Sequence, residues 1–153
     1  MTDKPRDLLA ELQASIDRHR EQLRAAMPRM IVIPLSYRRP PLTTNRMPRN
    51  HAHRARVVRE IQDEVGWRVK GFEPVAAPVV VRLIWTVPDR RVRDASGPDP
   101  TLKAAQDGLV TAGVLPADRH EIVRRSYCEI EHKPGEPMSM RIEITPARDT
   151  KEA

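Results

Sequence analysis

Three carboxylates are spread around an arginine-rich segment of this sequence. Asp94 ends the run PDRRVRD, which covers residues 88–94, and Asp99 and Asp118 follow it. Carboxylate oxygens are the ligands that Mg²⁺ prefers, and a nuclease that hydrolyses phosphodiesters needs such a metal among cationic side chains. The three could converge in space if they lie at a strand end, at a helix start and just after that helix. The alternative is that Asp94 and Asp118 are ordinary solvated loop residues.

Arginine dominates the charge of this segment and of the one before it. No acidic residue occurs between Glu21 and Glu60, whereas nine arginines do. Such density is the electrostatic footprint of a polyanion-binding surface, although a solvated face of an arginine-rich protein is the alternative. We favour contact with nucleic acid. The side chains expected to make it are Arg38, Arg39, Asn45, Arg46, Arg49, Arg54, Arg56, Arg59, Arg90, Arg91 and Arg93.

Aromatic residues that could stack on unpaired bases are nearly absent from the basic region, where Tyr37 stands alone. Single-stranded nucleic acid is usually bound by such stacking. The sequence therefore favours a duplex or a junction, contacted through its phosphates.

Three segments have the apolar periodicity of helices that could position these residues. The first covers residues 5–27, with an apolar stripe that must lie on something, either on its own domain or on a partner protomer. The second covers residues 50–67, with Asn50 as its N-cap. The third begins with Asp99 as N-cap and Pro100 at the first helical position, and ends at Gly113.

Four segments are expected to be strands: residues 30–35, 79–87, 122–131 and 138–145. Residues 79–87 are apolar on both faces, which predicts a central strand covered on both sides and assigns Trp85 to the core. Pro34 cannot donate to a ladder, so the first strand is expected at an edge or a bulge. The predicted fold is α/β (α+β), with a single mixed β-sheet of about four strands and helices packed on it.

Length and composition limit the class of protein. The 153 residues fit one domain, and 27 Lys and Arg against 21 Asp and Glu give a net charge of +6. No apolar run approaches the roughly 20 residues of a membrane helix, and residues 1–6 lack the apolar stretch of a secretory signal. Cys128 is the only cysteine, which excludes an internal disulfide and suits a reducing cytosol. We expect a cytoplasmic protein with no membrane partner.

The segment from residue 88 to 118 resembles the signature of the RusA family of Holliday junction resolvases. That signature runs Pro-Asp-Arg-Arg-X-Arg-Asp-X-Asp-Asn, then Lys, Asp-X-Leu, Ala-Gly and a closing Asp-Asp, and much of it is matched here. Upstream, the run PPLTTN at residues 40–45 is similar to the family's Pro-Pro-Ser-X-Asn region. The resemblance covers residues 31–145, so only the first helix is an extension.

The resemblance implies a homodimeric, Mg²⁺-dependent endodeoxyribonuclease that nicks opposing strands of a four-way junction in DNA recombination and repair. Mn²⁺ is the expected substitute metal. The first metal-binding Asp of the family falls on Asp94, the essential Lys on Lys103 and the last Asp on Asp118. Resolvases of this kind are often encoded in phage or prophage genomes. By analogy, we predict that the protein acts in a bacterial cell and has a phage or prophage origin. The implied divisions are a helical extension over 1–28, a RusA-like endonuclease domain over 29–147 and a disordered tail over 148–153.

One departure from the pattern leaves two functions open. Ser96 stands where the family has its second Asp, and Gly97 where it has Asn. Asp99 precedes Lys103 by four residues, which leaves two roles open for it. It either replaces the missing metal ligand or only caps a helix. In the first case the metal ligands are Asp94, Asp99 and Asp118, and the catalytic set is these three with Lys103. The alternative function is a catalytically impaired protein that still binds DNA junctions.

Overall fold

The strands of the protein form one mixed sheet, so the predicted α+β class is confirmed. The computed structural model describes residues 5–26, 30–76 and 78–147. The predicted helix end at Met27 and the tail over 148–153 lie outside these residues. In chain order the elements are α1 (Pro5–Ala26), β1 (Ile31–Leu35), α2 (His51–Arg68), β2 (Val79–Val87), α3 (Asp99–Thr111), β3 (Val123–His132) and β4 (Ser139–Pro146).

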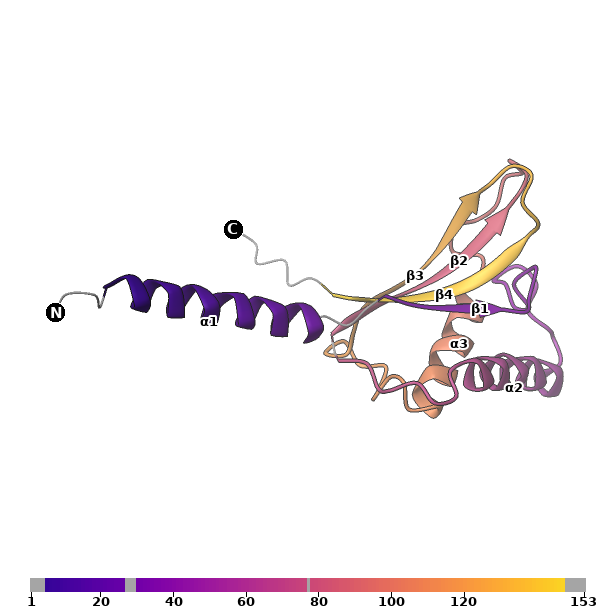
Figure 1. Cartoon of the computed structure of the whole chain (residues 1–153). Coiled ribbons are helices and arrows are strands. Elements are labelled where there is room, and N and C mark those ends of the chain that lie inside the picture. Colours follow the sequence, from indigo (N-terminus) through magenta and orange to yellow (C-terminus); the bar gives the residue numbers. More distant parts are fainter. Residues whose placement is uncertain (1–4, 27–29, 77, 148–153) are drawn as a thin grey trace.

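The strand order in the sheet is β1-β4-β2-β3 (Figure 1). β2 pairs antiparallel with β4 and parallel with β3, so β3 and β4 are consecutive in the sequence but not neighbours in the sheet. β1 pairs antiparallel with β4 and forms one edge, which is the place expected for a strand that contains Pro34. The register places Trp85 of β2 beside Met140 of β4 and Ile130 of β3.

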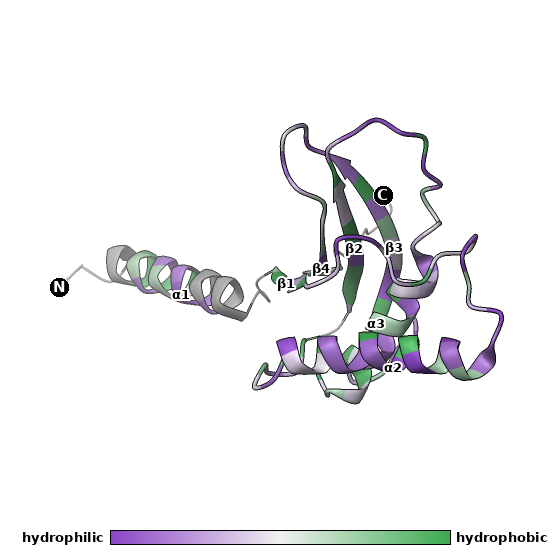
Figure 2. Cartoon of the chain, turned by 90° about the vertical axis from the view of Figure 1, so that its right-hand side faces the viewer, coloured by the Kyte–Doolittle hydropathy of each residue, from purple (hydrophilic) through white to green (hydrophobic). Residues whose placement is uncertain are grey.

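The helices α2 and α3 cover one face of this sheet (Figure 1). Between them lies the aliphatic core, in which Val81, Leu83, Ile61, Val65 and Leu109 are fully buried. The strands β2 and β4 are accordingly rich in hydrophobic residues, whereas the loops around them are mostly hydrophilic (Figure 2). The packed helices hold the start of α3 in place, and α3 carries Asp99 and Lys103, two of the residues for which the sequence predicts chemistry.

Gly108 allows α3 to pack closely on α2. A Cβ atom added at this glycine would lie 3.0 Å from the Cα of Gln62, which is closer than packed side chains tolerate. The N-cap of α2 is Asn50 as predicted, since its side chain accepts hydrogen bonds from the backbone N–H groups of Ala52 (2.8 Å) and His53 (3.3 Å).

The other face of the sheet is covered by ion pairs, which differs from the expectation of two apolar layers. Arg82 contacts Glu129 at 3.1 Å and also pairs with Glu143, whereas Arg141 contacts Glu143 at 2.8 Å and Glu131 at 3.0 Å. Glu143 is only 5% exposed, so the stems of these long side chains exclude water from the middle of the sheet. This explains why β2 has apolar residues on both faces although helices pack on one.

The apolar stripe of α1 is not covered by the rest of the described chain. Leu8, Leu9, Leu12 and Ile16 are between 41% and 71% exposed, and α1 contacts no other described helix or strand. The partner expected for this stripe is therefore not part of the described protomer. Among the described residues no helix is both long and apolar enough to cross a membrane.

Candidate nucleic-acid interface

Two loops that are distant in the sequence are joined at the start of α3. We call residues 36–50 the proline loop and residues 88–98 the aspartate loop. Thr101 is fully buried; its hydroxyl accepts a hydrogen bond from the backbone N–H of Leu42 (3.0 Å) and donates to the Leu42 carbonyl (2.6 Å). The backbone N–H of Thr44 donates to the carbonyl of Gly97 (3.0 Å). The two hydrogen bonds of Thr101 hold the proline loop against the start of α3, and the bond from Thr44 to Gly97 joins it to the aspartate loop.

Asp89 organises the first half of the aspartate loop. Its carboxylate accepts hydrogen bonds from the Arg93 guanidinium (2.7 Å) and from the backbone N–H of Arg91 (3.0 Å). The hydrogen bond from Arg93 is the main reason that the pKa of Asp89 falls to about 2. Arg93 in turn lies over the ring of Trp85, 5.1 Å from its centroid. The Arg93 side chain is therefore held in one orientation and is only 13% exposed.

A tight turn forms the second half of the aspartate loop. The Asp94 carboxylate accepts hydrogen bonds from the backbone N–H of Ser96 (3.2 Å) and from its hydroxyl (3.0 Å). The backbone N–H of Gly97 donates to the Asp94 carbonyl (3.0 Å). A Cβ at Gly97 would lie 3.0 Å from the same carbonyl oxygen, so any other residue would force the turn to shift.

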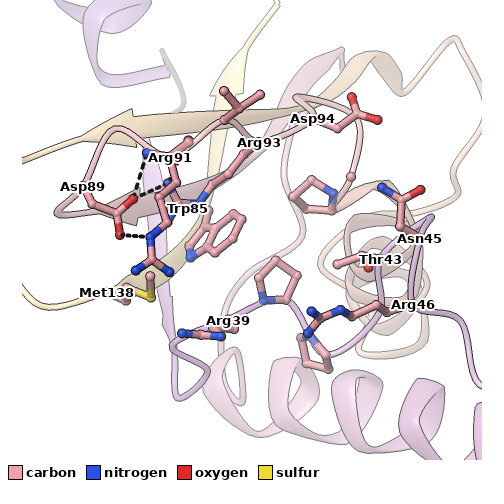
Figure 3. A pocket seen from close by; sticks show the side chains of 15 residues that line it. Arg39, Thr43, Asn45, Arg46, Trp85, Asp89, Arg91, Arg93, Asp94 and Met138 are labelled. Atoms are coloured by element: carbon pink, nitrogen blue, oxygen red, sulfur yellow. Dashed lines mark hydrogen bonds and ion pairs between the residues drawn. The ribbon is translucent and has the colours of Figure 1, made fainter.

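The two loops enclose a pocket of about 640 Å³, which we call the arginine pocket (Figure 3). Trp85 lies near its centre, and Asp89 and Asp94 are the acidic residues in its lining. The basic residues of the lining come from both loops and are Arg39, Arg46, Arg91 and Arg93. Four positive charges against two negative ones make the pocket attractive to anions.

The remaining basic residues predicted to contact nucleic acid lie outside this pocket. Most of them are exposed, whereas Arg54 is partly buried and donates a hydrogen bond to the carbonyl of Pro48 (3.1 Å). Asn45 lines the pocket beside Arg46. The exposed arginines outside the lining are Arg38, Arg49, Arg56, Arg59 and Arg90.

Lys103 lies between two carboxylates, one of which comes from beyond the end of α3. Its ammonium group contacts Asp107 at 2.8 Å, one helical turn later, and Asp118 at 2.8 Å. The pKa of Lys103 is raised, first by the hydrogen bond to Asp107 and then by that to Asp118. The pKa of Asp118 is lowered, mainly by the hydrogen bond from Lys103. The structure thus brings together Lys103 and Asp118, two residues that the sequence resemblance singles out, and keeps both in their charged forms.

Asp99 does not cap α3, contrary to one of the two interpretations of the sequence. It is the first helical residue, preceded by Pro98 as N-cap, because the turn at residues 94–98 brings the chain into the helix one residue early. Its carboxylate lies near the thiol of Cys128, whose pKa is raised first by burial and then by this negative charge. The two residues line a second pocket, of about 490 Å³, together with Ser96 and Lys103.

The three carboxylates predicted to hold Mg²⁺ do not converge. Asp94 is engaged by the hydroxyl of Ser96 and Asp118 by the ammonium group of Lys103, while Asp99 lines the second pocket beside Cys128. Within the described ranges, no three His, Cys, Asp or Glu side chains are placed to hold a metal ion. The residues as they lie therefore do not fit a Mg²⁺ site, and binding of Mg²⁺ or Mn²⁺ to Asp94, Asp99 and Asp118 stays a prediction.

Trp85 is the lining residue that sequence interpretation assigned to the core alone. In the structure it is partly buried, packs on the core with one part of its ring and lines the arginine pocket with another. The available signal is its position near the end of β2, just before the polar aspartate loop. A core-facing residue at a strand end can extend past the helices that cover the middle of the sheet.

Comparison with known proteins does not assign the chain to a family. No protein-family model matches it, and no curated protein does either.

Proposed function

We propose that the protein binds duplex or branched DNA through the arginine pocket and the exposed arginines around it. The convergence of four arginines from two distant loops on one pocket carries this proposal. Preference for a four-way junction is proposed from the resemblance to RusA resolvases. A homodimer would present two such pockets to one junction.

The charges of the pocket are available to an anionic ligand. Within the described part of the chain, Arg39 and Arg46 take part in no ion pair, and both side chains belong to exposed residues. Arg91 reaches Asp89 only at 3.9 Å. By contrast, Lys103 is already neutralised by two carboxylates, so the arginines rather than this lysine supply the attraction for phosphate.

The test measures DNA affinity against salt concentration by fluorescence anisotropy, with a labelled four-way junction and a linear duplex of the same length. We expect tighter binding of the junction and a steep fall of affinity with salt. Each phosphate contact contributes about 0.9 to the slope of log affinity against log salt on duplex DNA. Replacing Arg39, Arg46 and Arg91 by Gln should therefore lower the slope by about 1–3.

The matched control removes three other positive charges. Arg124 and Arg125 are exposed at the start of β3, which pairs with the opposite end of β2 from Trp85, and the exposed Arg119 lies in the loop just before β3. Their replacement by Gln should leave the slope close to that of the parent. If both triple variants lowered the salt slope equally, the attraction would come from net charge alone. This result would contradict a binding role for the pocket.

A second candidate function is Mg²⁺-dependent, structure-selective cleavage of Holliday junctions. The contact between Lys103 and Asp118, 15 residues apart, favours it, because these are two of the residues that the resemblance names. The purified protein would be incubated with a synthetic four-way junction in Mg²⁺ or Mn²⁺, beside Asp118→Asn as the inactive control. Ser96→Asp restores the missing acid and should increase nicking if Asp99 does not act as the ligand in its place. If neither the parent nor Ser96→Asp cuts branched DNA, this candidate is rejected and the binding proposal stands.

A further inference from the structure

The indole of Trp85 is positioned rigidly inside a cationic pocket. Its Nε1–H donates a hydrogen bond to the backbone carbonyl of Arg38 (3.1 Å), which ties the ring to the proline loop. Arg93 covers part of the ring and is itself held by Asp89. The rest of the ring that is not packed on the core lines the pocket (Figure 3).

The walls around the indole are apolar and the surrounding charges are positive. Pro40 and Pro41 of the proline loop and Met138 contribute apolar surface, while Arg39 and Arg46 lie at the same pocket with their charges unpaired among the described residues. A volume of about 640 Å³ is within the range of pockets that enclose small organic ligands. Flat apolar surface beside free guanidinium groups suits a ligand that has an aromatic ring and a phosphate on one molecule.

We propose that the arginine pocket takes one unpaired nucleotide of a bound DNA, with the base against Trp85 and its phosphate on Arg39 and Arg46. This inference rests on the proposed DNA-binding function and names the part of the DNA that enters the pocket. A paired base cannot present its face to a side chain, because its neighbours in the stack cover both faces. Unpaired bases are available at branch points, bulges and gaps.

The proposal changes the substrate expected from the sequence alone. The scarcity of aromatic residues near the basic loops favoured contact with phosphates only, because Trp85 was placed in the core. With Trp85 in the pocket, the basic surface has one aromatic side chain at its centre. One such residue is enough for a single base and too few for a long single strand.

The first experiment compares two DNA ligands: a fully paired duplex, and the same duplex with a central bulge of two thymidines. Trp85→Leu should weaken binding of the bulged duplex by roughly five-fold or more, which is the loss expected when one base–aromatic contact is removed. Its affinity for the fully paired duplex should fall less, because that ligand loses only the support that Trp85 gives to Arg93 and the proline loop. The measured quantity is therefore the ratio of the two affinities, and an equal loss for both duplexes would contradict the nucleotide site. Trp67→Leu is the matched control, because Trp67 is 73% exposed on α2 and lines a different surface pocket, so both affinities should stay at the parent values.

The second experiment leaves Trp85 intact and does not depend on how Trp85→Leu folds. In Trp67→Phe the remaining tryptophan is Trp85, since the sequence contains two. The bulged duplex should quench the fluorescence of Trp85. The paired duplex should not quench it when the same fraction of the protein is bound. Equal quenching by both ligands, or by neither, would overturn the nucleotide site while leaving DNA binding intact. If the parent binds neither duplex in a salt-dependent manner, the proposed function itself fails.

Discussion

Thr101→Val tests whether the two loops are joined by the hydrogen bonds that the structure shows. Valine has nearly the shape of threonine, so the variant removes the hydroxyl and little else. The hydroxyl of Thr101 is the partner of both the N–H and the carbonyl of Leu42, and both residues are at most 1% exposed. The variant therefore leaves two backbone groups without a partner in a site that water does not reach.

The expected loss follows from the cost of those two groups. A buried polar group that loses its partner costs about 1–3 kcal/mol, and the lower part of that range applies to a carbonyl, so we expect about 2–4 kcal/mol in the free energy of unfolding. For a protein of this size each kcal/mol lowers Tm by about 2–4 °C, which gives a fall of about 4–16 °C. Urea unfolding followed by circular dichroism measures the first quantity, and a thermal scan the second.

The control for this variant is Thr111→Val. Thr111 is exposed at the other end of the same helix, so its change should alter stability by less than about 0.5 kcal/mol. DNA affinity should fall in Thr101→Val under conditions where the protein stays folded, because the proline loop carries Arg39 and Arg46. A loss below about 1 kcal/mol for Thr101→Val would refute the reasoning, since it would mean that the loop relaxes or that water replaces the hydroxyl.

Three further outcomes are expected. Replacing Arg54, Arg56 and Arg59 of α2 together by Gln should flatten the salt dependence of DNA binding, and an unchanged slope by anisotropy would place the DNA elsewhere. Asp94→Asn and Asp118→Asn should each abolish any Mg²⁺-dependent nicking in gel assays, and persistent nicking would contradict this. DNA binding should be kept or strengthened, because removing a negative charge relieves repulsion of phosphate. The protein should have the mass of a homodimer by light scattering at micromolar concentration, since the apolar stripe of α1 is uncovered in the described residues. A monomeric mass would count against the pairing of two DNA-binding sites in one dimer.

Periodicity was sufficient to predict the class of fold but not the order of its strands. Alternation and apolar runs located all four strands, and Asn50 located the start of α2, because these signals depend only on neighbouring residues. The insertion of β4 between β1 and β2 is set by pairing between distant segments, which no local pattern encodes. The apolar residues on both faces of β2 predicted that its second face is covered. They did not predict that ion pairs of Arg82 and Arg141 cover it, because these pairs join different strands.

The candidate site was predictable in its composition and less so in its geometry. The sequence singled out Lys103 and Asp118 by resemblance but did not predict that they contact each other; the convergence that it predicted was that of the three carboxylates, which the structure does not show. The sequence predicted Asp99 as the N-cap of α3, but Asp99 is the first helical residue. The turn at residues 94–98 starts the helix one residue earlier than predicted. The role of Trp85 was missed because a residue pattern gives the face on which a side chain lies, but not how far the covering helices extend along that face.

Two of the positions at which the chain departs from the RusA pattern, Ser96 and Gly97, also shape this loop. The hydroxyl of Ser96 donates to the Asp94 carboxylate, where a second carboxylate would instead repel it. Gly97 lets the turn close, and its carbonyl accepts the hydrogen bond from Thr44 that links the two loops. An asparagine at residue 97 would bring its Cβ to 3.0 Å from the Asp94 carbonyl oxygen, so the turn would have to open slightly to accept the residue that the RusA pattern has there. Both residues therefore favour a closed loop that supports the arginine pocket over a group of carboxylates open to a cation, which favours the proposed DNA binding over the proposed cleavage.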